Sequence, residues 1–217
     1  MAKTTTVLAI SRQFGSGGSI IGHAVAERLG MKVADREILW RAAQECGLEE
    51  HTVEQLEEKP EGFWHSFLSA CSYVSPEVPY VPPPIPPVYE EHVFELERRI
   101  MRELADQFDV VIIGRAGYHV LADHPGLVSV LIHAPKPWRI QHIMQIHGRD
   151  EKSATALVET MDRQREAFIR TVTGAGSFNE MARSHDLCIN TGTIGLEEAT
   201  EMVIRLVSDR RQQLTRA

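Results

Sequence analysis

Cysteine is scarce in this chain, and its three cysteines, Cys46, Cys71 and Cys188, are far apart. Because no CxxC pair is present, neither a zinc ribbon nor a disulfide framework is indicated. Long apolar runs are also lacking, and none approaches the roughly 20 residues that a membrane-spanning helix needs. The N-terminus passes into a predicted strand without the apolar segment and cleavage site of a signal peptide. We therefore expect a cytoplasmic protein that does not bind a membrane.

Positive charge is in deficit, because 23 lysines and arginines stand against 30 acidic residues, for a formal charge of -7. A protein that binds duplex nucleic acid usually has a basic surface, so this balance argues against that role. It does not exclude a small basic pocket for a phosphorylated metabolite. Two catalytic signatures are missing as well: no HExxH zinc motif and no GxSxG nucleophile elbow occurs.

The pattern of apolar residues predicts an α/β fold in a single domain of 217 residues. Helical segments separate five short apolar segments, which indicates a three-layer fold with a five-stranded parallel sheet covered on both faces. The predicted strands are residues 7–10, 31–34, 110–113, 127–132 and 187–189. The predicted helices are residues 20–29, 38–43, 94–108, 137–144, 147–170 and 196–207. In such sheets ligands bind beyond the carboxyl ends of the strands.

Residues 76–87 interrupt this alternation, because they hold seven of the eleven prolines. Proline lacks an N–H group and fixes φ, so neither a helix nor a central strand is expected there. We predict an extended, partly polyproline II excursion.

A glycine-rich loop follows the first predicted strand and leads into the first predicted helix. Backbone N–H groups in such a loop, together with the helix dipole, favour an anion. We therefore predict a phosphate site. Its residues are Gly15, Ser16, Gly17, Gly18, Ser19 and Ile20.

The loop departs from the P-loop pattern GxxxxGK[ST] in two places, because Arg12 replaces the first glycine and Gly18 replaces the lysine. Ser19 keeps the hydroxyl that usually contacts Mg²⁺. The predicted strand 110–113 ends in Gly114 where a magnesium-positioning aspartate is usual. Asp35 is a possible substitute for that carboxylate. The dinucleotide-binding pattern GxGxxG fits less well, because its third glycine is missing.

Five segments in order along the chain resemble the cytidylate kinase-like family, relatives of bacterial cytidylate kinase among the P-loop nucleoside monophosphate kinases. They are ISRQFGSGG at 10–18, DREIL at 35–39, IIGRAG at 112–117, IHAP at 132–135 and DLCINT at 186–191. The glycine loop of this family often lacks the lysine, as here. The resemblance implies the sheet of a P-loop nucleoside monophosphate kinase, with acceptor-binding and lid insertions.

The resemblance also divides the chain. It implies a core of residues 1–34, 90–145 and 174–217, an acceptor-binding region with the proline-rich insert at 35–89, and a lid at 146–173. The implied acceptor-binding residues are Asp35, Arg36, Gly114 and Arg115. Asp35 can equally be a helix N-cap.

Arginines are the candidates for stabilising the transferred phosphoryl group, since this transfer needs positive charge and exclusion of water. Arg12 is the candidate to replace the missing lysine. The others lie in or beside the lid, where they can also pair with nearby carboxylates on a solvated helix face. They are Arg139, Arg149, Arg163 and Arg170.

The expected function is ATP-dependent phosphoryl transfer, with Mg²⁺, to a nucleoside monophosphate, by resemblance CMP or dCMP. Two alternatives stay open. One is a nucleotide-binding regulatory module with weak catalysis, because the lysine and the aspartate are missing. The other is a kinase for a different small phosphate acceptor, since a scaffold does not fix its substrate.

Overall fold

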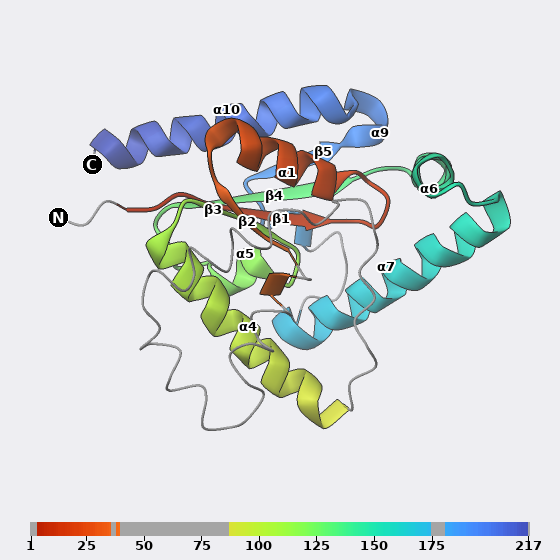
Figure 1. The fold of residues 1–217 in the computed structure, drawn as a ribbon, viewed down its shortest axis with the longest axis horizontal. Helices are drawn as coiled ribbons and strands as arrows, with labels where there is room; N and C mark the ends of the chain where they lie inside the picture. Colours follow the sequence, from red (N-terminus) through yellow and green to blue (C-terminus); the bar gives the residue numbers. More distant parts are fainter. Residues whose placement is uncertain (1–3, 36–37, 40–86, 175–180, 217) are drawn as a thin grey trace.

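The computed structural model describes residues 4–35, 38–39, 87–174 and 181–216 (Figure 1). Its five strands form one parallel sheet in the order β2-β3-β1-β4-β5. The strands are β1 (Val7–Arg12), β2 (Lys32–Ala34), β3 (Val110–Ile113), β4 (Leu127–His133) and β5 (Leu187–Asn190). All five predicted strands are confirmed, with ends that differ from the prediction by at most two residues.

Helices cover both faces of the sheet. In Figure 1, α1 and α10 lie above the sheet, α4 and α5 lie below it, and α7 runs from α6 back under the sheet toward α4. The helices are α1 (Gly18–Leu29), α4 (Pro87–Gln107), α5 (Gly117–Val120), α6 (Lys136–His147), α7 (Glu151–Thr173), α9 (Thr191–Ile194) and α10 (Leu196–Arg216). The predicted three layers are therefore present.

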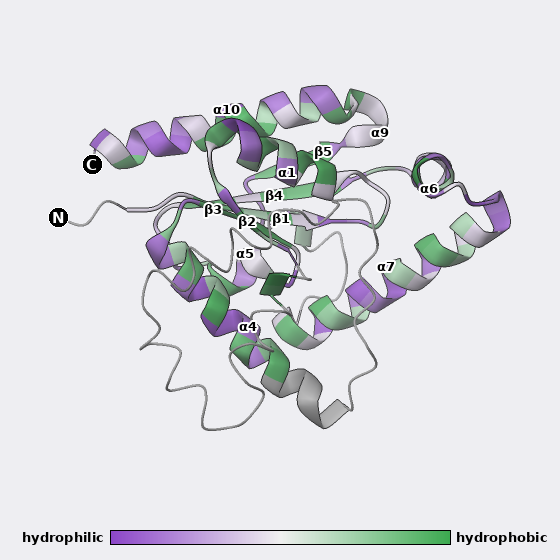
Figure 2. Ribbon diagram, viewed as in Figure 1, coloured by the Kyte–Doolittle hydropathy of each residue, from purple (hydrophilic) through white to green (hydrophobic). Residues whose placement is uncertain are grey.

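The alternation of side chains along β1 divides the core in two. Leu8 and Ile10 pack with residues of α1 and α10, whereas Val7 packs with residues of α4 on the opposite face. Because both faces are buried, the first four residues of the strand, VLAI, are all apolar, which explains the short uninterrupted apolar run (Figure 2).

The sheet order brings together loops that are distant in sequence. β1 lies between β3 and β4, with Ile10 opposite Ile113 and Arg12 opposite Ile132. Because the strands are parallel, all their carboxyl ends meet at one edge. The glycine loop after β1 is therefore adjacent to Gly114 and to the end of β4.

The helices differ from prediction mainly at their ends. α4 starts at Pro87, seven residues before the predicted helix, and proline is well tolerated in the first helical turn. Most of the predicted helix 38–43 and of the proline-rich stretch 76–87 lies outside the described residues. No described helix is long and apolar enough to cross a membrane.

Candidate functional site

The glycine loop joins the end of β1 to the start of α1 at the carboxyl edge of the sheet. Gly15 and Gly17 adopt left-handed backbone angles, with φ of 77° and 80°, which glycine accepts without strain. Gly17 is the N-cap of α1 and supplies no side-chain capping hydrogen bond. The first N–H groups of α1 also lack intrahelical acceptors, so they are available to an anion.

The Ser16 side chain points into the protein and holds the glycine loop through hydrogen bonds. It is fully buried, and Oγ donates to the carbonyl oxygens of Gln13 and Ile132 at 2.8 and 3.2 Å. Thr191 Oγ1 donates to the carbonyl oxygen of Ser16 at 2.8 Å. The Ser16 hydroxyl therefore shapes the loop, and Thr191 is a supporting residue that the sequence pattern did not indicate.

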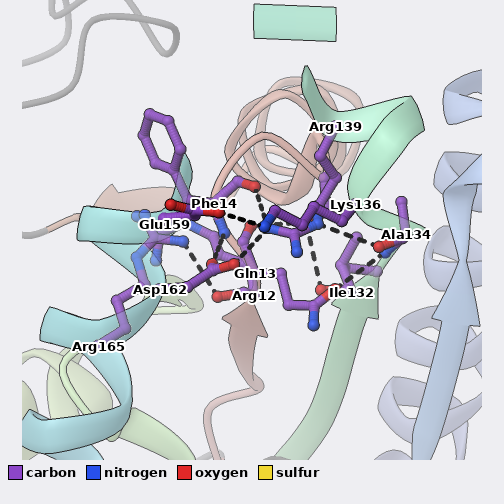
Figure 3. Close-up of polar contacts among 11 residues, drawn as sticks. Arg12, Gln13, Phe14, Ile132, Ala134, Lys136, Arg139, Glu159, Asp162 and Arg165 are labelled. Atoms are coloured by element: carbon purple, nitrogen blue, oxygen red, sulfur yellow. Dashed lines mark hydrogen bonds and ion pairs between the residues drawn. The ribbon is translucent and has the colours of Figure 1, made fainter. Parts of the chain in front are cut away.

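Arg139 binds the loop to the helices that follow β4 (Figure 3). It is only 4% exposed, and its Nη1 donates to the carbonyl oxygen of Phe14 at 2.9 Å and to Asp162 Oδ2 at 2.7 Å. Its Nε donates to the carbonyl oxygen of Ala134 at 3.0 Å. Asp162 Oδ1 in turn accepts from the N–H of Phe14 at 3.3 Å. The guanidinium of Arg139 is thus committed to holding the loop against α6 and α7.

Two more side chains of these helices bind loop carbonyls. Arg165 of α7 donates from Nη1 to the carbonyl oxygen of Arg12 at 3.1 Å, and its guanidinium lies over the ring of Phe14. His142 of α6 places Nδ1 at 2.8 Å from the carbonyl oxygen of Gly15, so Nδ1–H donates there. His142 was not among the predicted site residues, although it lies three positions after Arg139 and so shares a helix face with it.

Arg12 lies across the start of α1. Its Nε donates to Ser19 Oγ at 3.0 Å, and its stem packs against Gly18, where an added Cβ would lie 2.7 Å from Arg12 Cβ. Its Nη1 lies so close to Gly114 that a Cβ there would overlap with it. The structure therefore brings together four predicted site residues, Arg12, Gly18, Ser19 and Gly114.

His23 adds an uncharged side chain beside this group. Burial lowers the pKa of its imidazole, the charge of Asp35 acts in the opposite direction, and the Arg12 guanidinium lowers the pKa further. Its buried Nε2 has no hydrogen-bond partner among the described residues. His23 lies four residues after Ser19 on the same helix face, a spacing that could have indicated it.

The corner between Ser19 and Gly114 is where a P-loop enzyme would hold magnesium, through the hydroxyl and an aspartate. Here the residues do not fit a protein-held metal. The Ser19 hydroxyl accepts a hydrogen bond from a cation, and the aspartate position is a glycine covered by the same guanidinium. No group of three or more potential metal ligands occurs among the described residues.

Arg115, beside Gly114, lies between α4 and α7. Its guanidinium pairs with the buried Glu97, and its Cζ lies 4.2 Å from the centre of the Phe168 ring and 5.3 Å from that of Phe94. Its backbone is left-handed, with φ of 51°, which is uncommon for a non-glycine residue. In this arrangement Arg115 fastens α7 to α4.

The remaining predicted residues are spread more widely. Asp35 Oδ1 accepts from the N–H of Ile38 at 3.0 Å, as an N-cap does, and Arg36 lies outside the described residues. The side chains of Arg149, Arg163 and Arg170 are exposed. Arg163 contacts Thr160 on its own helix, and Arg170 is 3.8 Å from Glu166 on the same helix.

A parallel sheet of order 2-3-1-4-5, with a glycine loop between its central strand and the first helix, defines a P-loop kinase fold. The family model of the cytidylate kinase-like family matches residues 7–193, and the chain belongs to this family. The family consists of P-loop kinases, which generally use ATP with Mg²⁺. No curated protein matches the chain.

Solved structures agree on the fold. The chain is similar to an uncharacterized protein from Eubacterium ventriosum ATCC 27560, with a TM-score of 0.67 and 21% identity over 94% of this chain and 99% of that one. TT1252 from Thermus thermophilus has a TM-score of 0.51 and 20% identity over 94% and 98%. A gluconokinase from Sinorhizobium meliloti 1021 has a TM-score of 0.50 and 14% identity over 98% and 99%.

Proposed function

We propose that this protein transfers the γ-phosphoryl group of ATP to a nucleoside monophosphate, with CMP or dCMP as the first candidates. The observation that carries the proposal is the uncapped N-terminus of α1 inside the glycine loop, with the Arg12 guanidinium hydrogen-bonded to Ser19 at the same place. Open N–H groups and a fixed positive charge together suit a polyphosphate.

In this proposal the protein positions groups and stabilises charge, because phosphoryl transfer needs little covalent chemistry from the enzyme. The N–H groups of residues 15–20 bind the donor phosphates. Arg12 supplies the charge that lysine at position 18 would supply. A Mg²⁺ ion bound to ATP, without a ligand from this protein, would neutralise further charge on the phosphates.

The lid of the proposal is α7 with the adjoining residues 146–150. Its exposed Arg149, Arg163 and Arg170 have guanidinium groups at the surface and would bind phosphate oxygens once both nucleotides are present. Arg139 contributes differently, because its buried contacts with Phe14 and Asp162 hold the loop in shape. Lid and loop are thus mechanically linked.

The acceptor would bind between the ends of β2 and β3, with Asp35, Arg36, Gly114 and Arg115 at its border. Most of the proposed acceptor region, 35–89, lies outside the described residues. A different small phosphate acceptor is therefore a second candidate substrate. The absence of lysine and aspartate at positions 18 and 114 favours a third reading, a nucleotide-binding module with weak catalysis.

The test is ADP release from Mg-ATP by the purified protein, measured with CMP, dCMP, UMP, AMP and GMP and with no acceptor. We expect release that depends on an acceptor and is fastest with CMP or dCMP. The Arg12→Ala variant should lose most of this activity, whereas Arg205→Ala, on the exposed surface of α10, should keep it. If the protein binds ATP but releases ADP equally fast with each acceptor and without one, the nucleotide-binding module is favoured.

A further inference from the structure

Two residues that P-loop kinases usually have are missing from this chain, the loop lysine at position 18 and the magnesium-positioning aspartate at position 114. In the structure a single side chain, that of Arg12, lies against both positions. The two departures are 96 positions apart in the sequence, yet they meet at one guanidinium. The side chain of Arg12 can therefore explain both the missing lysine and the missing aspartate.

We propose that Arg12 occupies the corner in which P-loop kinases hold magnesium, so that the protein provides a guanidinium there and binds no metal of its own. The inference rests on the proposed function, because that function supplies ATP as the ligand of this site. It goes beyond the replacement of the lysine, because it also assigns Arg12 the place of the metal.

The first argument is the contact at position 18. A Cβ on Gly18 would lie 2.7 Å from Arg12 Cβ and 3.3 Å from Ile132 Cβ. Real Cβ atoms essentially never lie within 3.0 Å of another heavy atom, and the backbone sets the position of Arg12 Cβ, so a larger residue at position 18 would require the backbone to shift. In this backbone a side chain at position 12 and a lysine at position 18 are therefore alternatives, and Arg12 requires glycine at position 18.

The second argument is the contact at position 114. A Cβ there would overlap with Arg12 Nη1, so an aspartate and the observed Arg12 conformation cannot coexist. The guanidinium also hydrogen-bonds Ser19 Oγ, the other usual metal ligand. Both protein ligands of the usual magnesium site are thus replaced or occupied by one cation.

The third argument is electrostatic. A divalent ion beside a guanidinium is repelled unless carboxylates intervene, and the described residues hold no group of three or more potential metal ligands. Asp35 Oδ1 already accepts a hydrogen bond from the N–H of Ile38.

The consequence is a nucleotide affinity that depends little on free Mg²⁺. The test is calorimetric titration of ATP into the full-length protein, once with Mg²⁺ and once with EDTA. We expect the two dissociation constants of the wild type to agree within about threefold. Arg12→Gln should weaken binding in EDTA by tenfold or more, and Arg12→Lys, which keeps the charge, should weaken it less.

Arg205→Ala is the matched control, because it removes an exposed arginine on α10, and its affinities should equal those of the wild type. Circular dichroism spectra and urea midpoints close to the wild type establish that the Arg12 variants are folded. Loss of tenfold or more in wild-type affinity on adding EDTA, with Arg12→Gln behaving like the wild type, would overturn the proposal.

A second measurement keeps the inference separate from the proposed function. Mn²⁺ is titrated into the nucleotide-free protein and followed by electron paramagnetic resonance. We expect no uptake by the wild type, and uptake by the double variant Arg12→Ala/Gly114→Asp, which restores a hydroxyl and a carboxylate. Uptake by the wild type that Ser19→Ala abolishes would overturn the inference. If ATP fails to bind in either buffer, the proposed function fails, and this titration alone decides the inference.

Discussion

Gly114 and Gly30 both adopt left-handed backbone angles, with φ of 83° and 64°, but their surroundings differ. A Cβ on Gly114 would meet the guanidinium of Arg12, whereas a Cβ on Gly30 would meet no heavy atom within 4 Å. The end of an arginine side chain can move aside at low cost. Gly114 therefore offers a way to shift the Arg12 charge without changing Arg12 itself.

We predict that Gly114→Ala weakens ATP binding by about tenfold, the loss expected when a charge-assisted hydrogen bond of roughly 1.4 kcal/mol is removed. Its loss of stability should resemble that of Gly30→Ala, about 1 kcal/mol for alanine in a left-handed conformation. Calorimetry and urea unfolding measure the two effects. Unchanged ATP affinity in Gly114→Ala would mean that the position of the Arg12 guanidinium does not matter for binding.

At the scale of elements, α6 and α7 are joined by two ion pairs of different burial. Arg139 with Asp162 is buried on the arginine side, at 5% side-chain exposure, whereas Lys136 with Glu159 is about half exposed on both sides. Only the first pair also binds the glycine loop, through Phe14. The loop, α6 and α7 therefore share one polar network.

We predict that Arg139→Ala destabilises the protein by about 3 kcal/mol, because it leaves loop carbonyls and a partly buried carboxylate without their partner. Lys136→Ala removes the exposed pair between the same two helices, and its effect should be small. Urea unfolding followed by circular dichroism compares them. Similar losses in the two variants would contradict a special role of the buried network.

The sequence was sufficient to predict the strands and most helices, but not the hydrogen bonds and ion pair of this polar network. Apolar runs such as Val110–Ile113 mark strands because burial on both faces demands them. The role of Arg139 could not be read in the same way, because its partners Phe14 and Asp162 are 125 and 23 positions away. The sequence indicated that Asp162 could pair with an arginine, but it did not indicate that the partner is Arg139.

On the scale of the whole molecule, the five strands predicted a parallel sheet, and the resemblance implied its kinase topology. The pattern within each strand does not determine its neighbours, so the contact of Arg12 with Gly114 across the β1–β3 pair follows only from the fold. The short helices α5 and α9 were not predicted, because four residues carry too little periodicity.

Partly buried histidines are expected to give the molecule a pH-dependent stability. Burial lowers the pKa values of four histidines, which are His23, His124, His133 and His185. The unfolded chain then binds more protons than the folded one once the pH falls below about 6.5, so the free energy of unfolding decreases there. Well above that pH these histidines are neutral in both states, so they should not change the free energy of unfolding.

His185 is the clearest case, because its neighbours come from β1, from α5 and from the segment before β5. Its Nε2 lies 2.8 Å from Ser11 Oγ and its Nδ1 2.6 Å from the carbonyl oxygen of Met181, and Tyr118 packs on the ring, while the charge of Asp186 opposes the effect of burial. We predict that the urea midpoint falls between pH 7 and 5.5, and falls less in His185→Gln. Equal slopes for the two proteins would contradict this assignment.

The most direct test of the central claim follows the γ-phosphate itself. The protein is incubated with γ-labelled ATP and CMP, and the labelled products are separated. Phosphoryl transfer predicts label in CDP, with little label in inorganic phosphate, and a loss of labelled CDP in Arg12→Gln. Label that stays in ATP or appears only as inorganic phosphate, with CMP and with every other nucleoside monophosphate, would contradict the assignment as a nucleoside monophosphate kinase.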